Sequence, residues 1–517
     1  MRCLNIDLNL HMILVLFLSR TCSCSELIVP IIIKASSAED GYKQCEHTVR
    51  HWASSSLNSE VKEDKHLLRD LLFFLHVPRT GGRTYFHCFL RKLYSSSQEC
   101  PRSYDKLRVD SRKPNCRLLS THDDYSIIYK LPKEKTSAVI ILRNPVERVF
   151  STFEFSVEVA ARFLIHPNLT SVGRMARLPR PKKAGVSTLD IWPWKYLIPW
   201  MIEDLFARRD AREHRGQTYT MTNNSYDMED ILMPLHEFIN EPIVRDIVHN
   251  GATFQIAGLT NNSHLAESHE VRHCVLKYPT FGKYVLEVAK KRLNDMLYVG
   301  LTENHKESAS MFANVVGAQV ISQLSTSRSK REIANNNDSE QSSSLPDSRM
   351  DANYQRNNTY TKVKKVSSIG KDEETNKNMT VGKLMEAYES CTSDLRNSQE
   401  ERRANSLKNI SPANFTKELS TFQARRHIPK VLLQKITSLN SLDMELYNYG
   451  QSIFAKQHER VMQTIVDTKR QETILIESAY INSYGSPSWK VLSLGTAGFS
   501  LLLFLFLSRR KTSKIKL

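Results

Sequence analysis

The sequence predicts an α/β protein with a mainly parallel, P-loop-like sheet flanked by helices. Strand-like apolar runs alternate with helix-like segments between residues 67 and 318. Such alternation is typical of parallel sheets whose strands are joined by helices. The segment FFLHVPRTGGRTYF, residues 73–86, leads from an apolar run through a proline, an arginine, a threonine and two glycines into a renewed helical pattern. This order predicts a strand, a tight loop and a helix.

Periodicity and β-branched content predict the individual elements. LLFFLHV, TSAVIILR, FQIAGL and MLYVGLT are expected to be strands, and TYFHCFLRKLY has helical spacing. NPVERVFSTFEFSVEVAARFL is expected to be a helix with Pro145 in its first turn, where proline is tolerated. An apolar face repeats at intervals of three and four residues near the C-terminus and predicts an amphipathic helix that packs on the α/β domain. That face consists of Leu439, Leu442, Leu446, Tyr449 and Ile453.

The net charge of +17 favours an anionic partner such as a nucleotide, an acidic polypeptide or an acidic glycan.

Composition and hydropathy divide the 517 residues into segments. We expect a signal peptide (1–24), an N-terminal lumenal segment (25–66), the α/β domain (67–321), an Asn/Ser-rich, glycosylated and largely disordered insert (322–425), C-terminal helices that pack on the domain (426–465), a stalk (466–488), a transmembrane helix (489–508) and a cytosolic basic tail (509–517).

The two ends of the chain predict the membrane topology. A short apolar core, residues 12–18, precedes small residues, which is typical of a signal peptide, although an uncleaved anchor is an alternative. Residues 491–507 carry no charge and RRKTSKIK follows, which favours a type I protein with its body in the lumen over a buried core helix. Eight N-x-[ST] sequons agree with this, at Asn168, Asn223, Asn261, Asn337, Asn357, Asn378, Asn409 and Asn414. Spacing does not give the pairing of the six later cysteines, Cys45, Cys88, Cys100, Cys116, Cys274 and Cys391.

The loop PRTGGRT predicts an anion site, because a glycine-rich turn into a helix presents backbone N–H groups. A plain turn is the alternative for this loop alone, and the absence of G-x-x-x-x-G-K-[ST] disfavours a nucleoside triphosphate. A second motif, RNPVERVFS, places Arg143 at a strand exit and Ser151 on the next helix, where they can clamp another phosphate. Two separated phosphates are a property of 3′-phosphoadenosine 5′-phosphosulfate (PAPS).

These motifs together resemble those of sulfotransferases. HVPRTGG resembles the 5′-phosphosulfate loop of Golgi enzymes, especially the heparan sulfate 6-O-sulfotransferases, and LRNPVERVFS resembles their 3′-phosphate element. VGLTE and LNSLDMELYNYGQSIF resemble later parts of the same domain. The whole chain resembles the plant-type tyrosylprotein sulfotransferases, which combine such a domain with a signal peptide and a C-terminal anchor. The resemblance implies the PAPS-dependent sulfotransferase fold and a Golgi membrane protein with a lumenal catalytic domain.

The resemblance also implies an activity: PAPS-dependent sulfuryl transfer to tyrosines of secreted peptide or protein precursors, usually beside aspartate, as in peptide hormone maturation. A Golgi heparan sulfate O-sulfotransferase is the alternative, and the topology disfavours it. A non-catalytic ectodomain is disfavoured by the paired phosphate motifs. No nucleic-acid partner is expected, and the oligomeric state does not follow from the sequence.

The resemblance implies specific residue roles. The donor would be bound by Arg79, Thr80, Gly81, Gly82, Arg83, Thr84, Arg143 and Ser151. Arg79 replaces the lysine that is usual in relatives; it is also expected to act in catalysis, by neutralising charge rather than donating a proton. His122, in THDDY, is expected to be the general base, with His76 as its rival. No CxxC…CxxC pattern is present, and no metal site is expected.

Three further features allow two interpretations each. Arg148 is expected to be an exposed charge that pairs with Glu147 or another acid. The basic stretches RMARLPRPKKAG and FARRDAREHR either attract acidic residues beside the acceptor or form a solvated face. The tryptophans of DIWPWKYLIPW are expected to pack in the core rather than to line a groove.

Overall fold

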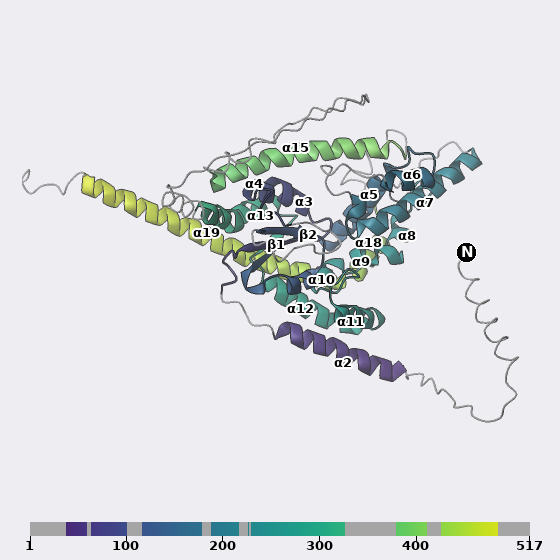
Figure 1. Ribbon diagram of the computed structural model, residues 1–517, viewed down its shortest axis with the longest axis horizontal. Coiled ribbons are helices and arrows are strands. Elements are labelled where there is room, and N and C mark those ends of the chain that lie inside the picture. Colours follow the sequence, from purple (N-terminus) through teal and green to yellow (C-terminus); the bar gives the residue numbers. More distant parts are fainter. Residues whose placement is uncertain are drawn as a thin grey trace, which may run out of the picture. The chain divides into compact units, whose positions relative to one another are not determined.

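The structure is a computed structural model of the chain (Figure 1). It describes residues 38–58, 64–100, 116–177, 188–216, 226, 229–325, 379–410, 425 and 427–483. Contacts divide the chain after His47, within helix α2 (Ala38–Leu57), and the account below concerns residues from Thr48 onward. The predicted signal peptide, transmembrane helix and basic tail lie outside the described residues. In the part that is described, we find no helix that combines the length and the apolar character needed to cross a membrane.

Four parallel strands form the central sheet in the order β2-β1-β3-β4. All residues of the four strands are buried, which explains their nearly continuous apolar sequences. Phe73 pairs with Leu119 on one side and with Ala138 on the other. The predicted α/β class and parallel sheet are confirmed. The strands are β1 (Leu71–Leu75), β2 (Leu118–Thr121), β3 (Thr136–Leu142) and β4 (Tyr298–Leu301).

Two element predictions differ from the structure. FQIAGL was expected to be a strand, but its first half, Phe254–Ile256, is the end of helix α10 (Gly251–Ile256), and a turn follows. The Asp443 carboxylate accepts hydrogen bonds from the backbone N–H groups of Ala252 and Thr253, so a distant residue caps this helix. Strand β2 was not predicted, because a short apolar run does not distinguish a strand from a buried helical turn.

Helix α5 (Pro145–Ala161) follows β3 and begins as the sequence predicts. The Asn144 side chain accepts hydrogen bonds from the N–H groups of Val146 and Glu147, at 3.0 and 3.3 Å. Helix α5 packs against α7 (Trp194–Arg215), where the Phe155 and Trp194 rings meet edge to face with centroids 4.7 Å apart. Trp192 and Trp194 are both buried, as expected for core packing.

The other helical elements connect the strands and cover the sheet. They are α3 (Gly82–Tyr85), η1 (Phe86–Leu90), α4 (Arg91–Leu93), η2 (Tyr125–Lys130), η3 (Lys133–Lys135), α6 (Leu169–Arg177), η4 (Thr188–Asp190), α8 (Leu235–Phe238), η5 (Pro242–Val244), α9 (Arg245–Val248), α11 (Ala266–Lys277), η6 (Pro279–Phe281), α12 (Gly282–Asn294), α13 (His305–Phe312) and η7 (Ala313–Gly317).

The predicted insert contains a long helix, α15 (Val381–Leu407). A disulfide between Cys88 and Cys391 joins α15 to η1, and the Tyr388 ring stacks on Phe89 at 4.0 Å. Residues 322–425 are therefore not disordered throughout; 326–378 lie outside the described residues. A covalent tether and a few buried side chains order a segment whose composition is poor in apolar residues. A second disulfide joins Cys100 to Cys116.

The C-terminal helices are α18 (Lys430–Leu439) and α19 (Ser441–Ser483). Helix α19 packs against α12 and β4 and continues through most of the segment expected to be a stalk. From α19, Asp443 forms an ion pair with Arg148 of α5 at 2.8 Å, and both side chains are 1% exposed. The prediction that Arg148 is an exposed charge is wrong, because its partner lies on a helix that sequence spacing does not reveal.

Candidate active site

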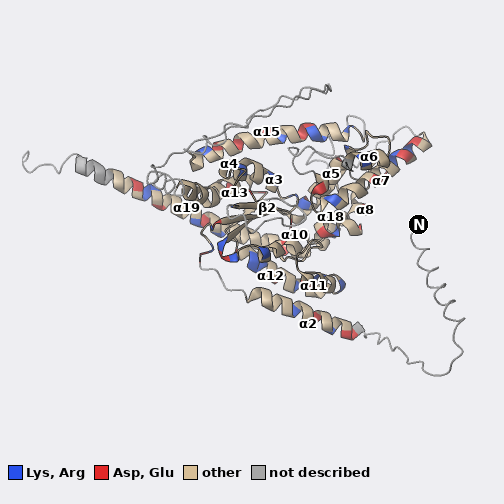
Figure 2. Cartoon of the chain, viewed as in Figure 1, with Lys and Arg blue, Asp and Glu red and all other residues tan. Residues whose placement is uncertain are grey.

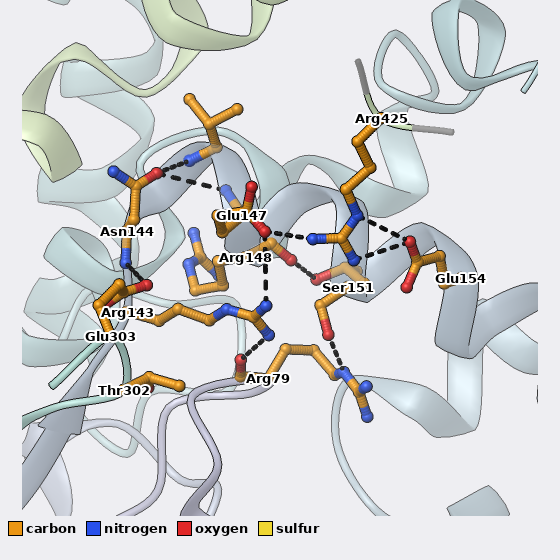
Figure 3. Close-up of polar contacts among 12 residues, drawn as sticks. Arg79, Arg143, Asn144, Glu147, Arg148, Ser151, Glu154, Thr302, Glu303 and Arg425 are labelled. Atoms are coloured by element: carbon orange, nitrogen blue, oxygen red, sulfur yellow. Dashed lines mark hydrogen bonds and ion pairs between the residues drawn. The ribbon is translucent and has the colours of Figure 1, made fainter. Parts of the chain in front are cut away.

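The predicted site residues meet at the carboxyl edge of the sheet, where the ends of parallel strands lie side by side. β1 leads into the glycine loop, β2 into His122, β3 into Arg143 and β4 into Thr302. Thr302 Oγ1 lies 2.8 Å from the carbonyl oxygen of Thr80, and Arg143 Nη1 donates to the carbonyl oxygen of Arg79 at 3.2 Å (Figure 3). The loop is therefore held by the two strand exits beside it.

The glycine loop has a backbone suited to an anion. Arg79 and Gly81 both lie in the left-handed region, with φ of 68° and 80°. Turns that include left-handed residues direct successive N–H groups into a concavity that binds anions. The hydroxyl of buried Thr80 donates to the Val77 carbonyl oxygen at 3.0 Å, which ties the loop to the strand end. A Cβ on Gly82 would lie 2.6 Å from His76 Nε2, so only glycine fits against this ring.

Arg79, Arg143 and Ser151 form one cluster. Arg79 Nε donates to Ser151 Oγ at 2.9 Å (Figure 3). The Arg79 guanidinium lies over the Phe155 ring at 4.4 Å. Burial and the nearby Arg143 lower the pKa of Arg79 to about 10. The sequence assigned Arg79 and Ser151 to different phosphates, but the structure places the Arg79 side chain along α5 beside Ser151.

Arg143 is a largely buried cation that lies close to another arginine. Burial and the charge of Arg425 lower the pKa of Arg143. Its Nε is buried and, within the described part of the chain, has no hydrogen-bond partner. Arg143 forms an ion pair with Glu147, at 3.7 Å. Arg143 and Arg425 repel each other, and the buried Nε–H of Arg143 has no acceptor within the described residues. Both observations indicate a site for an anion.

Glu303 orders the strand exits around this cluster. Its carboxylate accepts the backbone N–H of Asn144 at 2.9 Å and the Tyr447 hydroxyl at 2.8 Å. Tyr447 belongs to α19, and Asn144 caps α5. The VGLTE motif therefore connects β4 to the helix that carries Ser151.

The two candidate bases lie together. His122 Nδ1 is 2.9 Å from the His76 carbonyl oxygen, and the two rings stack with centroids 4.0 Å apart. Because a carbonyl only accepts hydrogen bonds, Nδ1 carries the proton and the lone pair of the neutral ring lies on Nε2. The Gln255 amide of α10 fixes both loops by donating to the carbonyl oxygens of His122 and His76, at 2.9 and 3.3 Å.

Both imidazoles are neutral near pH 7. Burial lowers the pKa of His122 to about 4, although its hydrogen bond to the His76 backbone opposes the shift. Burial, His122 and Arg79 lower the pKa of His76 well below its ordinary value. His122 is 6% exposed, whereas His76 is partly exposed. The structure brings the predicted base and its rival together and orients the ring of His122 by a hydrogen bond.

Comparison with known proteins identifies the family. No family model matches the chain. However, the chain is 53% identical to a protein from Arabidopsis thaliana named Protein-tyrosine sulfotransferase. The alignment spans 491 residues and covers 93% of this chain and 96% of that protein. The chain belongs to the protein-tyrosine sulfotransferase family. The resemblance seen in the motifs is confirmed, and the protein is an enzyme of the transferase class.

The remaining predicted residues of this family member lie on the first turn of α3. Arg83 is exposed, and Thr84 is partly exposed while its N–H donates to the Gly81 carbonyl oxygen at 2.9 Å. Within the described residues, no group of three or more His, Cys, Asp or Glu side chains could hold a metal ion.

The basic stretch FARRDAREHR is occupied by contacts within the enzyme. Arg208 pairs with Asp204 at 2.9 Å and with Glu237 at 3.1 Å, and Arg209 donates to the Pro167 carbonyl oxygen at 3.1 Å. Figure 2 shows both signs of charge along α7. Helix α7 therefore presents both acidic and basic side chains rather than a uniformly cationic surface. Much of the other basic stretch, 178–187, lies outside the described residues.

Sequence reasoning missed two arginines of the sulfotransferase site, Arg403 and Arg425. Arg425 contacts Glu147 and Glu154 of α5, and Arg403 of α15 lies 3.5 Å from Glu154. Both arginines come from the segment interpreted as a disordered insert. No local pattern distinguishes them from other basic residues of that segment, so only the fold reveals them.

Proposed function

We propose that this enzyme transfers the sulfuryl group of PAPS to the phenolic oxygen of tyrosines beside acidic residues in secreted peptide or protein precursors, and that its sheet and loops form the PAPS-dependent sulfotransferase fold. The 53% identity over 93% of the chain supports tyrosine as the acceptor. The observation that carries the donor assignment is the Arg79–Arg143–Ser151 cluster beside the glycine loop, at one edge of the sheet.

The residues present fit this donor. The buried Arg143 Nε has no acceptor among the described residues, and the pKa of both arginines is lowered, which together favour the binding of an anion. Arg143 and Ser151 would hold the 3′-phosphate. The backbone of Thr80, Gly81 and Gly82, with Arg83 and the Thr84 hydroxyl, would hold the 5′-phosphosulfate. PAPS supplies the activated sulfuryl group, and fixed cations stabilise the charge on its leaving phosphate.

Arg79 connects the two halves of the donor site, since its backbone belongs to the loop and its side chain contacts Ser151. A guanidinium keeps its proton near neutral pH, even with a pKa of about 10. Its contribution to catalysis is therefore charge neutralisation and the placement of the loop relative to α5. The proton of the reaction needs another group.

His122 supplies that group in our proposal. A tyrosine hydroxyl has a pKa of about 10, so a positioned base assists its attack near neutral pH. Neutral His122 offers the lone pair of Nε2 because Nδ1–H is held by the His76 carbonyl oxygen. His76 orients His122 through its backbone carbonyl and its stacked ring.

We place the enzyme in the Golgi membrane as a single-pass type I protein with a lumenal catalytic domain. The apolar segment before the basic tail and the apolar N-terminus support this topology. The Cys88–Cys391 and Cys100–Cys116 disulfides are typical of an oxidising compartment.

The test uses the full chain, sulfur-labelled PAPS and three acceptors: an Asp-Tyr peptide, its Asp-Phe counterpart and desulfated heparan sulfate. We expect label in the Asp-Tyr peptide alone. Label in the glycan instead would favour a glycan O-sulfotransferase. Binding of PAPS without label in any acceptor would remove the proposed reaction.

A further inference from the structure

Glu147 lies between two arginines that compete for it. Arg143 Nη2 and Arg425 Nη1 both contact Glu147 Oε2, and the Arg425 contact is the closer one, whereas Arg143 stands at 3.7 Å (Figure 3). Arg143 directly precedes the N-cap of α5 and Glu147 lies in the first turn of that helix, four residues on, so the two side chains are close enough to pair directly. Arg425 reaches the same carboxylate from a distant part of the sequence.

Arg425 also binds a second acid. Its Nε and Nη2 lie 3.2 and 2.8 Å from Glu154 Oε1. The Glu154 side chain is 7% exposed and also accepts the Tyr226 hydroxyl at 2.9 Å. Burial opposes the charge of Arg425, but Glu154 and Glu147 outweigh it and raise its pKa. Arg425 is thus a permanent cation that neutralises two carboxylates beside the donor site.

We propose that Arg425 is a positioning residue for the donor: by binding Glu147, it keeps the Arg143 guanidinium available to the 3′-phosphate. This inference rests on the proposed use of PAPS. Without Arg425, Glu147 would pair with Arg143 and would also repel an incoming phosphate, because charges interact strongly at a poorly solvated site.

Glu154 does not depend on Arg425 to the same degree. It keeps the Tyr226 hydroxyl and Arg403 of α15, which lies 3.5 Å away. Glu147 is more exposed, at 32%, and within the described residues its ion-pair partners are Arg143 and Arg425. The effect of losing Arg425 on donor binding should therefore pass through Glu147, which gives the proposal a specific double-variant test.

The experiment measures binding of 3′-phosphoadenosine 5′-phosphate to the full chain by calorimetry. Arg425→Gln should weaken binding about tenfold, the lower end of what a charge-assisted contact contributes. Adding Glu147→Gln to Arg425→Gln should restore most of the affinity. Adding Glu154→Gln should not, which makes this the matched control for a general effect of removing an acid. Arg215→Gln, an exposed substitution on α7, should bind normally.

The possible outcomes distinguish the proposed function of the enzyme from the positioning role of Arg425. Failure of the wild-type chain to bind the nucleotide would overturn the proposed function itself. Normal binding by Arg425→Gln, or rescue by Glu154→Gln rather than Glu147→Gln, would overturn the positioning role alone. If Arg425→Gln does not fold, two variants still decide. Arg425→Lys, which keeps the charge, should retain part of the affinity, and Glu147→Gln should bind at least as tightly as the wild type. Loss of binding in Glu147→Gln would refute the proposal.

Discussion

His122 should set the acidic limit of the reaction. Only the neutral ring accepts a proton, so activity falls when the pH drops below the pKa of His122. Burial lowers that pKa to about 4, which is about 2.5 units below the ordinary histidine value of about 6.5. kcat/KM, which reports on the free enzyme, should therefore stay constant through pH 6.5 and decline only in more acidic solution. His122→Ala should lower kcat by about 10²- to 10⁴-fold, the usual contribution of a general base.

The assay follows kcat/KM for an Asp-Tyr peptide from acidic to mildly alkaline pH in the wild type, His122→Ala and His76→Ala. Calorimetry with 3′-phosphoadenosine 5′-phosphate checks that donor binding persists in each variant. His76→Ala should cost less, because the carbonyl oxygen that holds His122 Nδ1 belongs to the backbone and remains. A decline of the wild-type kcat/KM that is already centred near pH 6.5 would refute the prediction that burial lowers the pKa of the base. Near-normal turnover in His122→Ala with loss in His76→Ala would assign the base to His76.

Three other predictions follow from the packing around the site. Arg143→Ala should weaken binding of 3′-phosphoadenosine 5′-phosphate by an amount equivalent to about 1.5–3 kcal/mol, and unchanged affinity in calorimetry would exclude Arg143 from the donor site. Arg148→Met should lower the free energy of unfolding by about 3–5 kcal/mol, because Asp443 is left buried without its ion-pair partner; chemical denaturation measures this, and adding Asp443→Asn should recover part of the loss. Deletion of 381–407 should lower the melting temperature, because buried Leu384, Tyr388 and Leu407 leave the core. Deletion of 331–370 alone, in the Asn/Ser-rich segment, should not. Equal melting temperatures for the two deletions would contradict a stabilising role for α15.

The sequence predicts the local parts of the site well. β1 and β3 are strongly apolar and are followed by a glycine loop or by a capping Asn144 and Pro145, so their ends and the residues beyond them could be placed. The parallel order of the strands then brings His122, Arg143 and the loop to one edge. Two other elements were harder to predict. β2 has only two apolar residues, Leu118 and Leu119, before Ser120 and Thr121, and α10 depends on a cap from Asp443 that the sequence does not place nearby.

The contacts that the sequence does not reveal are those between distant charges. Arg148 looks like any helical arginine until α19 presents Asp443, and Arg425 looks like any basic residue of a polar segment until it meets Glu147. In each case the pairing depends on how distant segments of the chain pack, and the acidic partner is absent from the sequence around the arginine. The Arg79 contact with Ser151 is also not evident from the sequence, because it depends on the left-handed backbone conformation of Arg79 in the loop.

One buried carboxylate connects the donor and base halves of the site. Asp443 of α19 binds Arg148 of α5 and also caps α10 through Thr253. Helix α5 carries Ser151 one turn beyond Arg148, and α10 carries Gln255, whose amide holds the loops of His76 and His122. The C-terminal helix α19 therefore contacts, through one carboxylate, both the helix that carries Ser151 and the helix that carries Gln255. Burying an ion pair is energetically unfavourable unless both charges are well partnered, and this pair holds in place the two helices on which the proposed donor-binding and base residues depend.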